Sequence, residues 1–191
     1  MNKLEFLYLS WEKLHQISLD LLKEINRKGI KFDRIVCISR GGLVVARIFS
    51  DFLKLPISNF TIVSYVSVGK TGKPKIVEPL GVKIKSETIL LVDEIVDHGT
   101  TLEKALSYLK KFRPRKIYSL GLVIKPWTKL RPDFWQIETE KWVVFPYEIR
   151  ETIDDLKKIW RKEKVSKEEV SERLGKIGLT KKQVDYFLKI S

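Results

Sequence analysis

Three carboxylates and a short run of small polar residues lie close together near the middle of the chain. Asp93 and Glu94 are adjacent, Asp97 follows, and residues 97–101 (DHGTT) add two threonine hydroxyls and a glycine. Backbone N–H groups and hydroxyls at such a turn bind phosphate, whereas carboxylates accept hydrogen bonds from sugar hydroxyls and can accept protons. A ribose 5-phosphate has a phosphate at one end and hydroxyls at the other, so it would use both kinds of group.

The residues on either side of this turn predict a strand, a loop and a helix. Residues 88–92 (TILLV) form a short apolar run, as expected of a strand buried on both faces of a parallel sheet. After the turn, apolar residues recur with the period of a helix, at Leu102, Ala105, Leu106 and Leu109. This order directs backbone N–H groups and the positive end of the helix dipole at one point, which suits an anion.

A second strand, glycine turn and helix occur near residue 40. Residues 34–38 (RIVCI) predict a strand, residues 39–42 (SRGG) a turn, and residues 43–53 an apolar helix. The paired glycines open a helix N-terminus and Arg40 adds positive charge, so a second anion site is expected. Taken alone, the same pattern also fits a glycine turn that holds no ligand.

Further apolar runs complete an alternation of strands and helices. Residues 60–66 and 116–123 predict two more strands, and residues 68–79 have no helical period and are expected to form a mobile loop, with a plain surface hairpin as the alternative. Such alternation implies a parallel sheet with right-handed crossovers. Tyr65 and the residue before it, Ser64, precede the expected loop.

An aromatic region beside a lysine follows the last of these strands. Lys125 is followed by Trp127, Trp135 and Trp142 within a short span. An aromatic wall next to an ammonium group is a good receptor for a flat heterocycle that carries a carbonyl oxygen. Trp127 and Trp135 are expected to belong to the hydrophobic core rather than to touch a ligand, because most aromatic residues are buried.

The residue patterns together resemble those of a known family. Four apolar residues, two acids, two apolar residues, Asp, any residue, Gly, any residue and Thr, over residues 89–101, resemble the signature of type I phosphoribosyltransferases that binds 5-phosphoribosyl 1-pyrophosphate (PRPP). His98 departs from that signature, which usually has Thr there. Residues 39–42 resemble the pyrophosphate loop of the xanthine-guanine branch, and residues 125–127, 132–135 and 140–148 resemble the purine-binding region of archaeal purine phosphoribosyltransferases.

The resemblance implies a fold and a reaction. The fold is an α/β structure in which a Rossmann-like parallel sheet is flanked by helices and a small hood, within a core at residues 1–150. The reaction is a purine-salvage transfer from PRPP to a purine base, which yields a nucleoside 5′-monophosphate and pyrophosphate. The family's members also suggest a homodimer. Residues 151–191 lie outside the resemblance and form a separate extension.

The resemblance also implies a role for each candidate site residue. The catalytic residues are Asp97, Asp93 and Glu94; the 5-phosphate is bound by Asp97, His98, Gly99, Thr100 and Thr101; and pyrophosphate is bound by Ser39, Arg40, Gly41 and Gly42, with a cis peptide between Arg40 and Gly41. Ser64 and Tyr65 belong to the flexible catalytic loop; Lys125, Trp142 and Val143 bind the purine; and Glu148, Asp93 and Glu94 hold Mg²⁺.

The identity of the base rests on the lysine. An ammonium group donates to a 6-oxo group and has nothing to accept from a 6-amino group, so Lys125 favours hypoxanthine, guanine or xanthine. Adenine remains an alternative if Lys125 points away from the ring. A second alternative, from another class, is a non-catalytic regulator that senses PRPP and binds nucleic acid.

Composition limits the remaining possibilities. The chain has 191 residues, a formal net charge of +13 and a single cysteine, Cys37, which excludes an intramolecular disulfide framework. The absence of a long apolar run or a leader-like N-terminus favours a cytoplasmic protein that binds no membrane. The positive charge is spread evenly along the chain, so a polyanionic substrate is a better explanation for it than nucleic acid. The 32% charged residues, with one Met and one Cys, are typical of proteins from thermophiles.

The C-terminal residues predict helices. Residues 151–164 read as a charged helix, and the capping boxes Ser166-x-x-Glu169 and Thr180-x-x-Gln183 each begin a further helix. A helical hairpin is therefore expected at the end of the chain, with a packing or dimer-supporting role.

Overall fold

The computed structural model describes residues 4–64 and 72–190, which fall into two compact units. His15–Glu140 form the first, here called the sheet unit. The segments Met1–Leu14 and Lys141–Ser191 form the second, here called the helical unit. Within the described residues, no helix has both the length and the apolar character that a membrane span requires.

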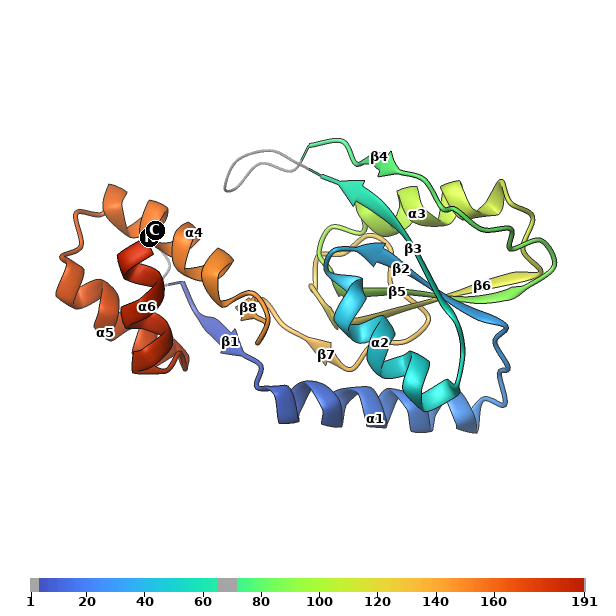
Figure 1. Ribbon diagram of the computed structural model, residues 1–191, viewed down its shortest axis with the longest axis horizontal. Helices are drawn as coiled ribbons and strands as arrows, with labels where there is room; N and C mark the ends of the chain where they lie inside the picture. Colours follow the sequence, from blue (N-terminus) through green and yellow to red (C-terminus); the bar gives the residue numbers. More distant parts are fainter. Residues whose placement is uncertain (1–3, 65–71, 191) are drawn as a thin grey trace. The chain divides into compact units, whose positions relative to one another are not determined.

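The sheet unit is built on a six-stranded sheet in the order β4-β3-β2-β5-β6-β7 (Figure 1). Every neighbouring pair is parallel except β3 and β4, which are antiparallel. This arrangement confirms the predicted α/β class with a mostly parallel sheet. Its strands and helices are β2 (Arg34–Ser39), β3 (Ile57–Val63), β4 (Lys75–Glu78), β5 (Thr88–Val96), β6 (Lys116–Ile124), β7 (Ile137–Glu138), α2 (Gly42–Leu53) and α3 (Thr100–Lys110), with α1 (Trp11–Arg27) leading into it.

The two central strands are buried on both faces, as their unbroken apolar runs predict. Val36 and Ile38 of β2 and Leu91 of β5 pack with Leu102 and Leu109 of α3 on one face. Side chains alternate along a strand, so the intervening residues point to the other face, which α2 covers (Figure 1). After Arg34 and Thr88 at their starts, β2 and β5 are apolar until Ser39 and Asp93 near their carboxyl ends.

Helix α1 begins after a capping serine and ends before a glycine. The hydroxyl of Ser10 accepts a hydrogen bond from the Lys13 N–H at 3.2 Å, which caps the first turn. Gly29, which follows the helix, has a φ of +65°, the left-handed conformation that commonly ends helices. The apolar face of the helix is buried at Leu14, Ile17, Leu21 and Ile25.

Two expectations for the edge of the sheet are wrong. Strand β3 spans Ile57–Val63 rather than residues 60–66, and β4 (Lys75–Glu78) lies within the segment expected to be a mobile loop. Strand β3 pairs with β2 on one side only, so the short stretch KIVE can pair with its other side, where Ile76 packs against the core. Tyr65 lies outside the described residues.

The helical unit combines a small sheet with three helices. Strand β1 (Phe6–Tyr8) pairs in parallel with β8 (Trp142–Val144). Three residues are too few to show a strand period, so β1 has no signal in the sequence. The helices are α4 (Ile149–Lys162), α5 (Lys167–Ile177) and α6 (Lys181–Ile190), whose shared core includes Leu156, Trp160, Leu174 and Val184.

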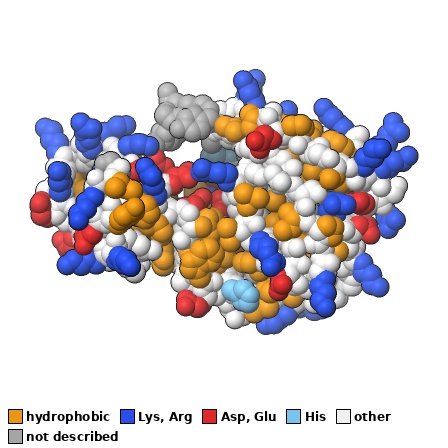
Figure 2. Space-filling model, in the orientation of Figure 1, with side chains coloured by type: hydrophobic (Ala, Val, Ile, Leu, Met, Phe, Trp, Pro, Cys, Tyr) orange, Lys and Arg blue, Asp and Glu red, His pale blue; other side chains and the backbone are white. Residues whose placement is uncertain are grey.

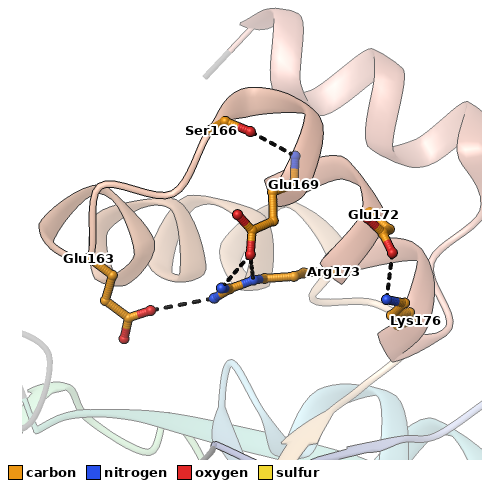
Figure 3. A network of polar contacts seen from close by, with 6 residues as sticks. All are labelled: Glu163, Ser166, Glu169, Glu172, Arg173 and Lys176. Carbon is orange, nitrogen blue, oxygen red and sulfur yellow. Dashed lines mark hydrogen bonds and ion pairs between the residues drawn. The ribbon is translucent and has the colours of Figure 1, made fainter.

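The C-terminal helical hairpin and the capping box at Thr180 are confirmed, whereas at Ser166 only one of the two bonds of a capping box is present and Glu169 pairs with Arg173 instead. The Ser166 hydroxyl accepts from the Glu169 N–H at 3.2 Å (Figure 3). The Thr180 N–H donates to the Gln183 side-chain oxygen at 2.8 Å, and the Gln183 N–H donates to the Thr180 hydroxyl at 3.3 Å. These bonds satisfy N–H groups that the first turn of a helix leaves without partners.

The same hairpin carries several exposed ion pairs. Arg173 bridges Glu169 at 2.7 Å and Glu163 at 3.4 Å, and Lys176 pairs with Glu172 one turn along (Figure 3). Exposed pairs contribute little to stability.

On the face drawn in Figure 2, Lys and Arg side chains are scattered over the surface with Asp and Glu among them.

The reactivity of Cys37 tests whether β2 is buried in the sheet as the structure shows. Burial, with a smaller contribution from the charge of Asp93, raises the pKa of the Cys37 thiol to about 12. The thiolate is the reactive form, and at pH 8 it would be roughly one part in ten thousand of the thiol. We expect a thiol reagent such as dithiobis(nitrobenzoate) to leave the native protein unmodified at pH 8 and to react fully after unfolding in guanidinium chloride. Labelling of the native protein at the rate of an exposed cysteine would contradict the buried β2.

Candidate active site

The order of the strands places a topological switch point between β2 and β5. From β2 the chain passes through α2 to β3 on one side, and from β5 it passes through α3 to β6 on the other. In open parallel sheets, ligands bind at the carboxyl ends of the strands beside such a point, because loops that diverge there leave a crevice. Both motifs predicted to bind anions follow the strands that flank it.

The carboxylates at the end of β5 meet the glycine turn that follows β2. Glu94 is buried, with 8% of its surface exposed, and Asp93 is half-buried and accepts the Glu94 N–H at 3.0 Å. A Cβ atom on Gly41 would lie 2.3 Å from the Glu94 side-chain oxygen Oε1. Glu94 and the glycine turn, of which Gly41 is 53 residues away in the sequence, are therefore direct neighbours.

The turn after β2 differs in one detail from the expectation. The cis peptide bond joins Ser39 and Arg40, not Arg40 and Gly41. Neither bond precedes a proline, so the residue types could not distinguish them. Ser39 is buried and its hydroxyl accepts from the side-chain amide of Asn59 at 3.0 Å, whereas Arg40 is exposed. Gly42 begins α2, and a Cβ on it would lie 2.5 Å from the backbone oxygen of Val92.

The second turn leads into α3 through a glycine in the left-handed conformation. Gly99 has a φ of +83°, and a Cβ there would approach Thr128 and Leu130 to 3.0–3.1 Å. The N-cap residue Gly99 has no side chain that could bond the backbone N–H groups of the first turn. His98 and Thr100 are exposed.

One hydroxyl pair links the start of α3 to the end of β3. The Ser64 and Thr101 hydroxyls lie 2.9 Å apart, and either can donate. Ser64 is predicted to belong to the catalytic loop and Thr101 to the phosphate turn, and the structure brings these two residues together. The sequence contains no signal for this contact.

Lys125 and Asp97 come together around a tryptophan. The Trp127 indole N–H donates to Asp97 Oδ1 at 2.6 Å, and the Lys125 ammonium lies 5.6 Å from the centre of the Trp127 ring. Burial lowers the pKa of Lys125 below its ordinary value, and the nearby carboxylate of Asp97 opposes that shift. The prediction that Trp127 belongs to the core is wrong, since 45% of its surface is exposed, whereas Trp135 packs against the core as expected.

The remaining predicted site residues belong to the helical unit. Trp142 and Val143 lie in β8, where Val143 is buried with 8% exposed and Trp142 is half-buried. Glu148 is half-buried and immediately precedes α4.

Comparison with known proteins supports the same family for most of the chain. The family model described as "Phosphoribosyl transferase domain" matches residues 8–152. A xanthine-guanine phosphoribosyltransferase from Gluconobacter oxydans is 28% identical over 144 residues, which is 73% of this chain and 83% of the relative. A hypoxanthine-guanine phosphoribosyltransferase from Saccharomyces cerevisiae is 30% identical over 148 residues, 66% of this chain and 65% of the relative.

Solved structures give the same result. The purine phosphoribosyltransferase from Pyrococcus horikoshii Ot3 superposes with a TM-score of 0.67 at 32% identity, covering 74% of this chain and 93% of that one. The xanthine-guanine-hypoxanthine phosphoribosyltransferase from Helicobacter pylori has a TM-score of 0.65 at 28% identity and covers 80% of this chain and 99% of that one.

Alanine substitutions at Gly41, Gly42 and Gly81 distinguish effects on ligand binding from effects on stability. In Gly42→Ala the new Cβ meets the Val92 backbone, which cannot yield, so we expect a loss of about 1–3 kcal/mol in the free energy of unfolding. In Gly41→Ala the new Cβ displaces the Glu94 carboxylate, so we expect ligand binding at the site to weaken more than stability. Gly81→Ala, which has open space around it, is the control. Urea unfolding and ligand titration of all three variants would check this, and equal stability of the Gly41 and Gly42 variants with intact binding would contradict it.

Proposed function

The chain belongs to the phosphoribosyl transferase family, and from that premise we propose that it is a purine-salvage enzyme that transfers ribose 5-phosphate from PRPP to a 6-oxopurine base. The observation that supports this most is the contact between the acids of β5 and the glycine turn after β2, with Asp97 and Lys125 beside them. A sugar that carries a 5-phosphate and a pyrophosphate needs anion sites on either side of carboxylates, and these two turns offer them. The relatives whose names specify xanthine, guanine or hypoxanthine support the choice of base.

The reaction makes separate demands on the protein. The bond between the anomeric carbon and pyrophosphate breaks, and a bond from that carbon to a purine ring nitrogen forms. Positive charge develops at the sugar as pyrophosphate leaves, and the purine ring loses an N–H proton as the product forms. The protein must therefore stabilise a cation, hold two anionic groups and accept one proton.

The acids of β5 meet the first demand. Asp93 and Glu94 carry negative charge at the end of a strand, and they can accept hydrogen bonds from the ribose 2- and 3-hydroxyls. Low exposure strengthens their attraction for a developing cation, since water screens it less. The close approach of Gly41 to Glu94 brings the pyrophosphate turn next to the bond that breaks.

The two turns meet the second demand. The 5-phosphate is assigned to residues 97–101, where the start of α3 presents backbone N–H groups and the hydroxyls of Thr100 and Thr101 are at hand. Pyrophosphate is assigned to Ser39–Gly42, where Arg40 adds positive charge. His98 replaces one hydroxyl in the phosphate turn, but the backbone donors remain.

Lys125 and Asp97 are assigned to the base. In a 6-oxopurine the oxygen at position 6 and the ring nitrogen N7 lie on the same edge, so neighbouring groups can address both. Lys125 donates to the oxygen, and Asp97 takes the proton from the ring. A buried ammonium gains more from a carbonyl partner than an exposed one does, because it has lost water. Trp142 and Val143 are assigned to the base on the family resemblance alone.

The carboxylates suit Mg²⁺ bound together with substrate. Among the described residues, no group of three or more His, Cys, Asp or Glu side chains could hold a metal ion. Mg²⁺ is commonly held by one or two carboxylates and the oxygens of substrate phosphates rather than by the protein alone. Asp93 and Glu94 provide such a pair, with Glu148 assigned on the resemblance. When bound, the ion would neutralise the charge of the departing pyrophosphate.

The proposed function is tested by base-dependent release of pyrophosphate. Wild-type protein with PRPP and Mg²⁺ should release pyrophosphate with hypoxanthine, guanine or xanthine, and much more slowly with adenine. In Lys125→Met the KM for the preferred base should rise about 10-fold or more, as expected for a lost hydrogen bond to a charged group, while the KM for PRPP stays constant. Lys129→Met, at an exposed lysine nearby, is the control. No release with any base would refute the function, and a preference for adenine would refute the role of Lys125.

Asp97 should matter for turnover rather than for PRPP binding. Asparagine keeps the size of the side chain but cannot accept a proton, so Asp97→Asn should lower kcat by about 100-fold or more and leave the KM for PRPP nearly unchanged. Asp51→Asn, at an exposed acid in α2, is the matched control. Steady-state rates measure both quantities, and wild-type turnover in the Asp97 variant would remove this residue from the chemistry.

A further inference from the structure

Trp127 is an exposed tryptophan with a hydrogen bond to the residue assigned as the proton acceptor. Its indole N–H lies 2.6 Å from Asp97 Oδ1, although 45% of the tryptophan surface is exposed. The Asp97 side chain is also half-exposed, at 50%. An exposed carboxylate on a turn would otherwise be free to rotate among several rotamers, so this bond selects one of them.

The donor and acceptor roles of Trp127 and Asp97 determine which Asp97 oxygen can accept the proton. An indole N–H is a donor only, so Asp97 Oδ1 must be the acceptor. Oδ1 already accepts this bond, so we assign Oδ2 as the oxygen that receives the proton. The bond also survives the reaction step, because a carboxyl group protonated on Oδ2 still accepts at Oδ1.

Trp127 is itself held firmly against the loop that carries Asp97. The Lys125 N–H donates to the Val96 carbonyl at 3.0 Å, and the Lys129 N–H donates to the His98 carbonyl at 3.4 Å. Between these two bonds, the Thr128 N–H closes a turn on the Lys125 carbonyl at 3.0 Å. The tryptophan thus lies at the tip of a turn that is fastened on both sides of Asp97.

Charged and aromatic neighbours hold the indole ring as well. The Lys125 ammonium lies 5.6 Å from the ring centre, within the range of a cation–π interaction. The His98 ring centre lies 6.4 Å away. The ring therefore touches the residue assigned to the base oxygen and donates to the residue assigned to the base proton.

We propose that Trp127 is a positioning residue, which directs Asp97 Oδ2 toward the purine N–H and keeps Asp97 and Lys125 at the spacing that a 6-oxopurine edge requires. This inference rests on the proposed function. The tryptophan does not take part in bond making. It reduces the number of conformations that Asp97 must lose when the base binds, and so lowers the barrier to the step in which the proton moves.

The test is Trp127→Phe, which keeps an aromatic ring beside Lys125 but removes the indole N–H. We expect kcat to fall about 10-fold, which corresponds to about 1.4 kcal/mol of activation free energy, with the KM for PRPP unchanged. Trp11→Phe is the matched control, since Trp11 is also exposed, at 54%, and lies in the other unit. Its kcat should equal that of the wild type.

A double-mutant cycle with Asp97→Asn distinguishes positioning from a general structural effect. If Trp127 acts through Asp97, Trp127→Phe should cause little further loss of kcat in the Asp97→Asn background, whereas a structural defect would cause the same loss in both backgrounds. Equal losses, an unchanged kcat in Trp127→Phe, or a rise in the base KM alone would overturn the inference. An inactive wild-type protein would instead refute the proposed function, so the two failures are distinguishable.

Discussion

The candidate site depends on the parallel pairing of β2 with β5. Hydrogen bonds align Arg34–Cys37 with Ile89–Val92, so the carboxyl ends of the two strands lie side by side. Both strands are covered by helices, and their polar residues therefore lie at the ends of the strands, with Ser39, Asp93 and Glu94 at the carboxyl ends. The pairing also makes the chain turn in opposite directions on either side, which opens the crevice that a ligand needs. Any register shift between the two strands would separate the acids from the glycine turn.

Close approach between backbones is the second requirement, and small residues provide it. Gly42 lies against the Val92 carbonyl and Gly41 against the Glu94 carboxylate, at distances that a Cβ atom could not adopt. The turn proposed to bind pyrophosphate is therefore directly beside the acids rather than one side chain away. The proposed reaction would use this spacing, since the electrostatic stabilisation of a cation next to an anionic leaving group falls with distance.

The same sheet also carries the groups assigned to the base. Strand β6 pairs with β5 as far as Ile124, next to Val96, so Lys125 and Asp97 each leave the sheet one residue later and enter neighbouring loops. The Trp127 indole then joins those loops through its hydrogen bond to Asp97. The two groups come from segments about 30 residues apart, and the strand pairing together with the indole bond determines their distance. The charge of Asp97 and the burial of Lys125 also act in opposite directions on the lysine pKa, as expected for neighbours in a partly dry site.

The sequence by itself determined the nature of the elements and of the chemistry: the apolar runs of β2 and β5, the capping boxes of α5 and α6, and the acids and turns that resemble the PRPP signature. These signals are local, because burial, capping and turn formation depend on residues within a few positions. Only the tertiary structure decided that residues 75–78 pair with the edge of β3, that the cis bond precedes Arg40, and that Trp127 is exposed and bonded to Asp97. Each of these depends on a partner far along the chain or on two peptide bonds that residue type does not distinguish, and no local pattern encodes it.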